Sequence, residues 1–243
     1  MVEAKDLLDQ LELEGGARRD ARLNLLRAEW LIAVGRAGEA LPLLAATEGD
    51  GRQQCRVISA KAMAFLSTAA LDDADRLVSD VDALCGDEPV YWRSLARLHL
   101  VRERPLEAVA ALHRAIELQS GNDAIRGEMA VALISAGEAA DAVHLLSDLM
   151  TREPERRDFR INLDYARGML GQRPQRTSAD DDLFWSGRLQ YAGLGARRAS
   201  LQQLAEALLG QAMIERPRYD ENLWRQYADV TGNTEKGPAL VSN

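Results

Sequence analysis

The chain has 243 residues, of which 47% are hydrophobic and 28% charged, and its formal net charge at pH 7 is −8. A chain of this length and apolar content can bury enough surface to fold without a metal ion or disulfide bonds. The acidic balance argues against nucleic acid as a ligand, because affinity for a phosphate backbone needs a basic face. No segment approaches the roughly 20 apolar residues that a membrane-spanning helix requires, so we expect no membrane insertion.

Residues 1–20 predict an N-terminal helix or cap. Val2–Leu13 has the pattern of a short amphipathic helix, which either covers the end of the fold or docks on a partner. The opening residues lack the apolar core of a signal peptide, so we expect a cytoplasmic protein, or a periplasmic one if a leader has been removed. Only three of the 30 basic residues are lysines, a bias typical of GC-rich bacterial genomes.

The two cysteines, Cys55 and Cys85, have no histidine or cysteine neighbours at the spacing of a metal site, so we expect no zinc. They lie at the two ends of one predicted helical hairpin. Because an antiparallel hairpin brings its ends together, a disulfide bond is one alternative. The interpretation that we favour is two separate, partly buried reduced thiols.

Small residues recur along the chain with a period of about 34 residues. Four alanines follow this period: Ala28, Ala62, Ala96 and Ala130. A second set of alanines follows it in another register: Ala40, Ala74, Ala108 and Ala142. Larger apolar residues do the same: Leu44, Val78, Leu112 and Leu146. A fixed period of this length indicates a repeat architecture, in which the alanines let two helices approach closely.

Each unit predicts two helices joined by a short turn. In residues 89–122, apolar residues at three- and four-residue spacing begin at Trp92, a break falls at Arg104–Pro105, and the spacing resumes at Ala108. Glycine is the residue that most readily ends a helix in a left-handed conformation. Three units have a glycine where the first helix should end: Gly35, Gly137 and Gly171.

The unit resembles the tetratricopeptide repeat (TPR). Trp92, Leu95 and Ala96 match the first helix of that motif and Leu106–Ala108 the second, and the next unit matches its second half again. The resemblance implies an all-α fold, a TPR-like α-solenoid of helix-turn-helix repeats. Four full repeats follow from the period: residues 21–54, 55–88, 89–122 and 123–156.

The pattern breaks in residues 157–177, which predict a partial fifth repeat. Asp164 and Arg176 occupy the positions of the two recurring alanines, so we expect a first helix without its partner. Residues 178–230 predict a non-repeating helical C-terminal cap that covers the last repeat.

Two capping boxes mark helix starts in that cap, Ser178 with Asp181 and Ser200 with Gln203. Residues 231–243 predict a disordered tail.

The resemblance implies a concave face lined by the first helices, which suits an extended peptide or a helix of another protein. Arg93 and Arg97 lie one helical turn apart in an otherwise apolar groove and could hold an acidic group. In the alternative, they are solvated or pair with Glu29 or Glu128. The period assigns the following residues to the groove: Leu25, Glu29, Ile32, Ser59, Met63, Leu66, Arg93, Arg97, Leu100, Gly127, Val131, Ile134, Ile161 and Tyr165.

The sequence contains no pattern that indicates catalysis. Phosphate-binding loops, a nucleophile elbow and a zinc-protease motif are missing, and the three histidines belong to different helices. The acids Asp180–Asp182 fit the first turn of a helix without a metal ion. We therefore expect no enzyme, no cofactor and no metal site.

The function that the resemblance implies is binding of another protein, as an adaptor or chaperone. In bacteria such proteins commonly serve secretion, pilus or envelope assembly. The TPR proteins that clamp a chaperone's terminal carboxylate carry Lys and Asn where this chain has Leu25 and Glu29, which disfavours a co-chaperone. One alternative is a self-assembling scaffold, a homo-oligomer in which a terminal helix fills a neighbour's groove. Another is a regulatory or catalytic module in residues 178–230.

Overall fold

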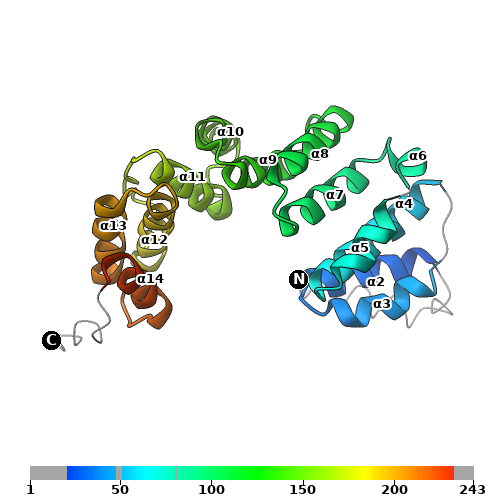
Figure 1. Cartoon of the computed structure of the whole chain (residues 1–243), viewed down its shortest axis with the longest axis horizontal. Helices are drawn as coiled ribbons and strands as arrows, with labels where there is room; N and C mark the ends of the chain where they lie inside the picture. The colour runs from blue at the N-terminus through cyan, green and yellow to red at the C-terminus, as the bar shows by residue number, and fades with distance from the viewer. Residues whose placement is uncertain (1–20, 48–50, 80, 233–243) are drawn as a thin grey trace. The chain divides into compact units, whose positions relative to one another are not determined.

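The computed structural model describes residues 21–47, 51–79 and 81–232. These residues form thirteen α-helices, α2 to α14, and contain no strand, which confirms the predicted all-α repeat fold (Figure 1). The predicted helix Val2–Leu13 lies outside the described residues. The chain divides into two compact units, Met1–Ile125 and Arg126–Asn243, and each is described by itself.

The first unit is built from three consecutive pairs of packed helices. The recurring alanines lie inside these pairs, where Ala28, Ala62 and Ala96 are at most 1% exposed. Side chains this small allow the two helices of a pair to approach closely. The pairs are α2 (Ala21–Ala33) with α3 (Ala37–Ala45), α4 (Gly51–Ser67) with α5 (Leu71–Val78), and α7 (Pro89–Val101) with α8 (Pro105–Leu118).

The turn inside each helix pair contains one residue in the left-handed conformation, and this position recurs with the same period as the alanines. Glycine occupies it at Gly35, Gly137 and Gly171, with φ between 75° and 89°, as the sequence predicted. Ala69 and Glu103 occupy it in the other two turns, with φ of 58° and 57°. The backbone geometry of the turn is thus more regular than its sequence.

Cys55 of α4 and Cys85 of α6 (Asp82–Cys85) form a disulfide bond, with their Cα atoms 5.5 Å apart. The prediction of two reduced thiols is therefore wrong. Both cysteines are at most 1% exposed, in an apolar cluster that includes Ile58 and Tyr91. The single helical turn of α6 packs against α4 and brings the second sulfur to the first.

The second unit begins with helices of the fourth and fifth repeats. They are α9 (Asp123–Ala136), of which residues 126–136 belong to this unit, α10 (Ala139–Arg152) and α11 (Arg157–Met169). Ala130 of α9 and Ala142 of α10 are fully buried, and Leu146, Phe159 and Leu163 belong to the same apolar cluster.

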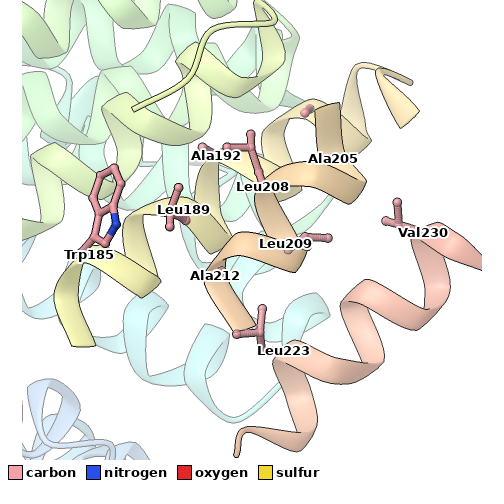
Figure 2. Close-up of a cluster of buried hydrophobic side chains, with 10 residues drawn as sticks. Trp185, Leu189, Ala192, Ala205, Leu208, Leu209, Ala212, Leu223 and Val230 are labelled. Carbon is pink, nitrogen blue, oxygen red and sulfur yellow. The ribbon is translucent and has the colours of Figure 1, made fainter. Parts of the chain in front are cut away.

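A second apolar cluster joins the last three helices, α12 (Asp182–Arg198), α13 (Gln202–Glu215) and α14 (Glu221–Thr231). Figure 2 shows its main side chains, which come from all three helices: Trp185, Leu189, Leu208, Leu209 and Leu223. These residues are at most 5% exposed, and their burial contributes to holding the three helices together.

Helix α12 packs directly against α11, where a second repeat helix would otherwise lie. The backbones approach most closely at two glycines. A Cβ atom on Gly168 would lie 2.0 Å from the carbonyl oxygen of Ala192, and one on Gly195 would lie 2.0 Å from that of Tyr165. Only glycine fits at these positions, so the contact is encoded by residues that the repeat pattern does not include.

The N-terminal ends of α12 and α13 differ from the capping boxes that the sequence predicted. Asp181 caps α12, because its Oδ1 accepts a hydrogen bond from the Phe184 amide at 2.8 Å, so the box with Ser178 at the cap is wrong. Ser200 has φ of 60° and ends α12, and it does not cap α13. Thr231, the first residue of the predicted tail, is the last residue of α14, and Gly232 is the C-cap of that helix. Residues 233–243 lie outside the described residues.

Candidate functional site

The first helices of the three pairs in the first unit lie next to one another, and two side-chain contacts join them. Arg56 Nη2 donates to both carboxylate oxygens of Glu29, at 2.8 and 2.9 Å. Arg97 Nη1 donates to the sulfur of Met63, one period earlier, at 3.7 Å. Equivalent positions of successive first helices are thus adjacent, and Glu29 pairs with Arg56.

Some predicted groove residues of the first unit are accessible and others are not. Leu25 and Ser59 are each 2% exposed, so their side chains belong to the interior. The accessible ones combine aliphatic and basic side chains, and we call them the first-helix row. They are the half-buried Ile32, Met63, Leu66, Arg93 and Leu100 and the exposed Arg97. Glu29 is also half-buried, but it is paired with Arg56 and is not counted in this row.

The predicted groove residues of the second unit divide in the same way. Gly127 is buried beneath Phe159, since a Cβ atom there would lie 2.6 Å from the Phe159 ring, and Ile134 is 8% exposed. Val131 is exposed, and Ile161 and Tyr165 are half-buried. A partner could contact these last three side chains, which come from α9 and α11.

Three charged side chains form a buried ion network in the second unit. Arg188 Nε donates to Asp164 Oδ2 at 2.6 Å, and its Nη1 donates to Asp180 Oδ2 at 2.6 Å and to the carbonyl of Gln175 at 3.0 Å. The amide of Thr177 also donates to Asp180 Oδ2, at 2.7 Å. The three charged side chains are at most 4% exposed.

Burial and the neighbouring charges have opposite effects on the pKa values of the three side chains in this network. Burial raises the pKa of Asp164, and the hydrogen bonds and charge of Arg188 offset only part of that rise. Burial also acts to raise the pKa of Asp180, but the Thr177 amide and the charge of Arg188 outweigh it and hold that pKa below its usual range. Although burial alone would lower the pKa of Arg188, its two carboxylate partners raise it. Arg188 therefore stays charged.

One signal in the sequence pointed to this network. Asp164 occupies the position of a recurring alanine, which is buried in every full repeat. A buried carboxylate needs a basic partner, but the period gives no information about α12, so it could not identify Arg188.

The remaining titratable residues form no metal site in the part of the chain that the structure describes, where no group of three or more potential metal ligands occurs. His99 is half-buried, and its Nδ1 has no hydrogen-bond partner among the described residues. Burial and the charge of Arg104 lower its pKa. None of the described helices is both long and apolar enough to cross a membrane.

Residues 102–167 match the family model of the tetratricopeptide repeat. The helix pairs of this chain are therefore of the tetratricopeptide type. No curated protein sequence matches it significantly. Proteins of this family bind other proteins or peptides and are generally adaptors without catalytic activity.

Two solved TPR structures share the fold. A thermophilic TPR protein of Thermus thermophilus is 16% identical, with a TM-score of 0.55 over 88% of this chain and 100% of its own. A tetratricopeptide repeat protein of Parabacteroides merdae is 11% identical, with a TM-score of 0.56 over 95% of this chain and 96% of its own. At these identities the likeness concerns the fold.

Proposed function

We propose that this chain is an adaptor that binds a segment of another protein along the first-helix row of its first unit. The supporting observation is that Ile32, Leu66 and Leu100 stand one period apart and are all partly accessible. Side chains at equivalent positions of adjacent first helices form a repeating apolar strip. Arg93 and Arg97 add positive charge to one end of this strip.

The spacing of the strip suggests the conformation of the partner. Adjacent packed helices lie about 8–10 Å apart. A polyproline II segment rises about 3.1 Å per residue and returns to the same side every three residues, or about 9 Å. We therefore propose a partner segment with an apolar residue at every third position and an acidic residue opposite Arg97.

The disulfide bond bears on the compartment in which this adaptor works. Disulfide bonds persist in oxidising compartments and are rare in the cytosol. The Cys55–Cys85 bond therefore favours the periplasm over the cytoplasm that the sequence led us to expect. Bacterial secretion, pilus assembly and envelope assembly are the settings in which we propose to seek the partner first.

The test compares the partner proteins that two folded variants of the chain capture. Leu66→Glu with Arg97→Glu changes the first-helix row. The matched control is Leu106→Glu with Arg114→Glu on α8, where Leu106 is 66% exposed. Circular dichroism and urea unfolding should show that both variants are folded. We expect the wild type and the control to capture a common protein that the row variant loses.

The captured protein then supplies the decisive measurement. A synthetic peptide from it should bind the wild type and the control with equal affinity and the row variant at least tenfold more weakly. Equal binding by all three proteins would contradict the proposal. If the chain captures only further copies of itself, and the mass of its particles in solution rises with protein concentration, the self-assembling scaffold would be favoured.

A further inference from the structure

One face of α11, the first helix of the fifth repeat, carries charged residues. In the fourth repeat the equivalent face of α9 is apolar and packs against α10. One period earlier, Ala130 and Leu133 belong to the apolar cluster shared with α10. Their counterparts on α11 are Asp164 and Arg167. Helix α12 packs against this face in place of a second repeat helix, and residues 170–181 run as an irregular segment between α11 and α12. Beside its contact with α12, this face therefore carries charged side chains where the fourth repeat carries apolar ones.

A cavity of about 550 Å³ lies over this face. Its polar lining comes from α11, from the segment that follows it and from α12. The polar lining consists of four arginines, Arg160, Arg167, Arg173 and Arg188, together with Gln172, Gln175 and Thr177.

The four arginines of the cavity are not fully neutralised. Arg188 is shared between Asp164 and Asp180. Arg160 lies 3.7 Å from Asp180 Oδ1 and also donates to the Thr177 hydroxyl at 3.3 Å. In the part of the chain that the structure describes, Arg167 and Arg173 form no ion pair. Four guanidinium groups thus face two carboxylates, which leaves two positive charges unmatched.

Like charges held in one cavity repel one another and reduce the stability of the fold. An anion in the cavity would remove this repulsion. The planar guanidinium group of arginine matches the oxygens of a phosphate group and can donate two parallel hydrogen bonds to it. The Thr177 hydroxyl and the Gln172 amide are neutral groups that can also donate hydrogen bonds.

We propose that this cavity binds a phosphate monoester. The ester carries a charge of about −1.5 to −2 at pH 7, which matches the two unmatched positive charges. The cavity has room for more than the phosphate group, and Met150 and Leu163 form an apolar part of its wall for the esterified group. The phosphate belongs either to a small metabolite or to a phosphorylated side chain of another protein.

This site is separate from the first-helix row, which belongs to the other unit, and it does not depend on the proposed adaptor function. Either proposal can fail without the other.

The test uses the full chain and three probes: inorganic phosphate, phosphoserine and a phosphoserine peptide. Binding is measured by calorimetry at constant ionic strength, with sodium chloride as the reference salt. The cavity variant is Arg167→Gln with Arg173→Gln. The matched control is Arg197→Gln with Arg225→Gln, which removes the same charge from exposed positions of the same unit outside the cavity.

We expect a phosphoserine-containing probe to bind the wild type and the control, and to bind the cavity variant at least tenfold more weakly. Without ligand, the cavity variant should unfold at the same urea concentration as the wild type or a higher one, because it relieves repulsion. This measurement separates a lost site from a lost fold.

The probes also distinguish the two sources of the phosphate. Comparable binding of free phosphoserine and its peptide would indicate a small metabolite, and binding of the peptide alone would indicate a partner's side chain. Binding of inorganic phosphate alone, equal binding by the cavity variant, or no binding beyond that of chloride would overturn the proposal.

Discussion

Asp164 and Arg188 form a two-point ion pair between α11 and α12, with Nε 2.6 Å from Oδ2 and Nη2 3.3 Å from Oδ1. In the full repeats an alanine occupies the position of Asp164. The same helix face that elsewhere permits close helix packing therefore holds a charge here, and the irregular end of the repeat array depends on that charge being paired.

Removal of one partner should be far more harmful than removal of both. Arg188→Met leaves the buried Asp164 without its ion-pair partner and leaves Asp180 with Arg160 at 3.7 Å, so we expect the free energy of unfolding to fall by about 3–5 kcal/mol. Adding Asp164→Ala, which restores the alanine of the repeat, should recover part of that loss. Urea unfolding of the two single variants and the double variant measures the coupling. Strictly additive losses would show that the pair is not coupled.

The second prediction concerns Ala69, which occupies the left-handed turn position with φ of 58°. The left-handed conformation costs an alanine about 1–2 kcal/mol, and glycine avoids this cost but loses more backbone entropy on folding. We expect Ala69→Gly to stabilise the chain by about 0.5–1 kcal/mol. The reverse change at the equivalent position, Gly35→Ala, should destabilise it by a similar amount. Thermal unfolding measures both, and a loss of stability in Ala69→Gly would contradict the geometry of this turn.

The sequence predicted those features of the fold that recur. The period identified the buried alanines and the three glycine turns because the same packing contact requires the same residue in each repeat. It did not identify Ala69 and Glu103 as left-handed, since neither residue type signals that conformation. It placed Leu25 and Gly127 in the groove although both are buried, because a period fixes which positions are equivalent and not how the helices are rotated.

The repeat period could not predict contacts between segments that do not belong to the repeat. The Cys55–Cys85 bond depends on α6, a single turn with no counterpart in the other repeats. The cavity of the fifth repeat depends on Arg173, in an irregular segment, and on Arg188, in a non-repeating helix. Asp164 was the visible sign of this site, because a carboxylate at an alanine position requires a partner.

The third prediction tests the close approach of α11 and α12. Gly168→Ala would place a methyl group against the Ala192 carbonyl oxygen, so we expect a loss of about 1–3 kcal/mol or more in the free energy of unfolding. Gly187→Ala is the matched control, because no atom lies within 4 Å of its added Cβ. That change should stabilise α12 by about 0.5–1 kcal/mol through helix propensity alone. If both variants behave alike in urea unfolding, the close contact is absent.

The fourth prediction concerns the disulfide bond, whose cysteines are 30 residues apart in the sequence. By loop-closure entropy, a bond across a loop of this size should stabilise the chain by about 3–4 kcal/mol. Dithiothreitol should therefore lower the urea midpoint of the wild type. It should have no effect on the double variant Cys55→Ala with Cys85→Ala, which should unfold near the midpoint of the reduced wild type. An unchanged wild-type midpoint after full reduction, verified by thiol titration, would contradict this stabilisation.

The fifth prediction is a pH dependence that arises from Asp220, the N-cap of α14. The Leu223 amide donates to its carboxylate at 3.0 Å, and this bond, aided by Arg216 and opposed by burial, lowers the pKa of Asp220. A carboxyl group with a lowered pKa in the folded state stabilises that state above its unfolded pKa of about 3.9, and the contribution is lost as pH falls further.

Asp220→Asn isolates that contribution, because asparagine caps a helix about as well as aspartate but does not titrate. Near pH 7 the variant should be somewhat less stable than the wild type, since it loses the ion pair with Arg216. Between about pH 4 and pH 2 its stability should fall less steeply, so that the two curves converge. Urea unfolding across this range measures the difference, and two parallel curves would mean that the pKa of Asp220 is the same in the folded and unfolded chains.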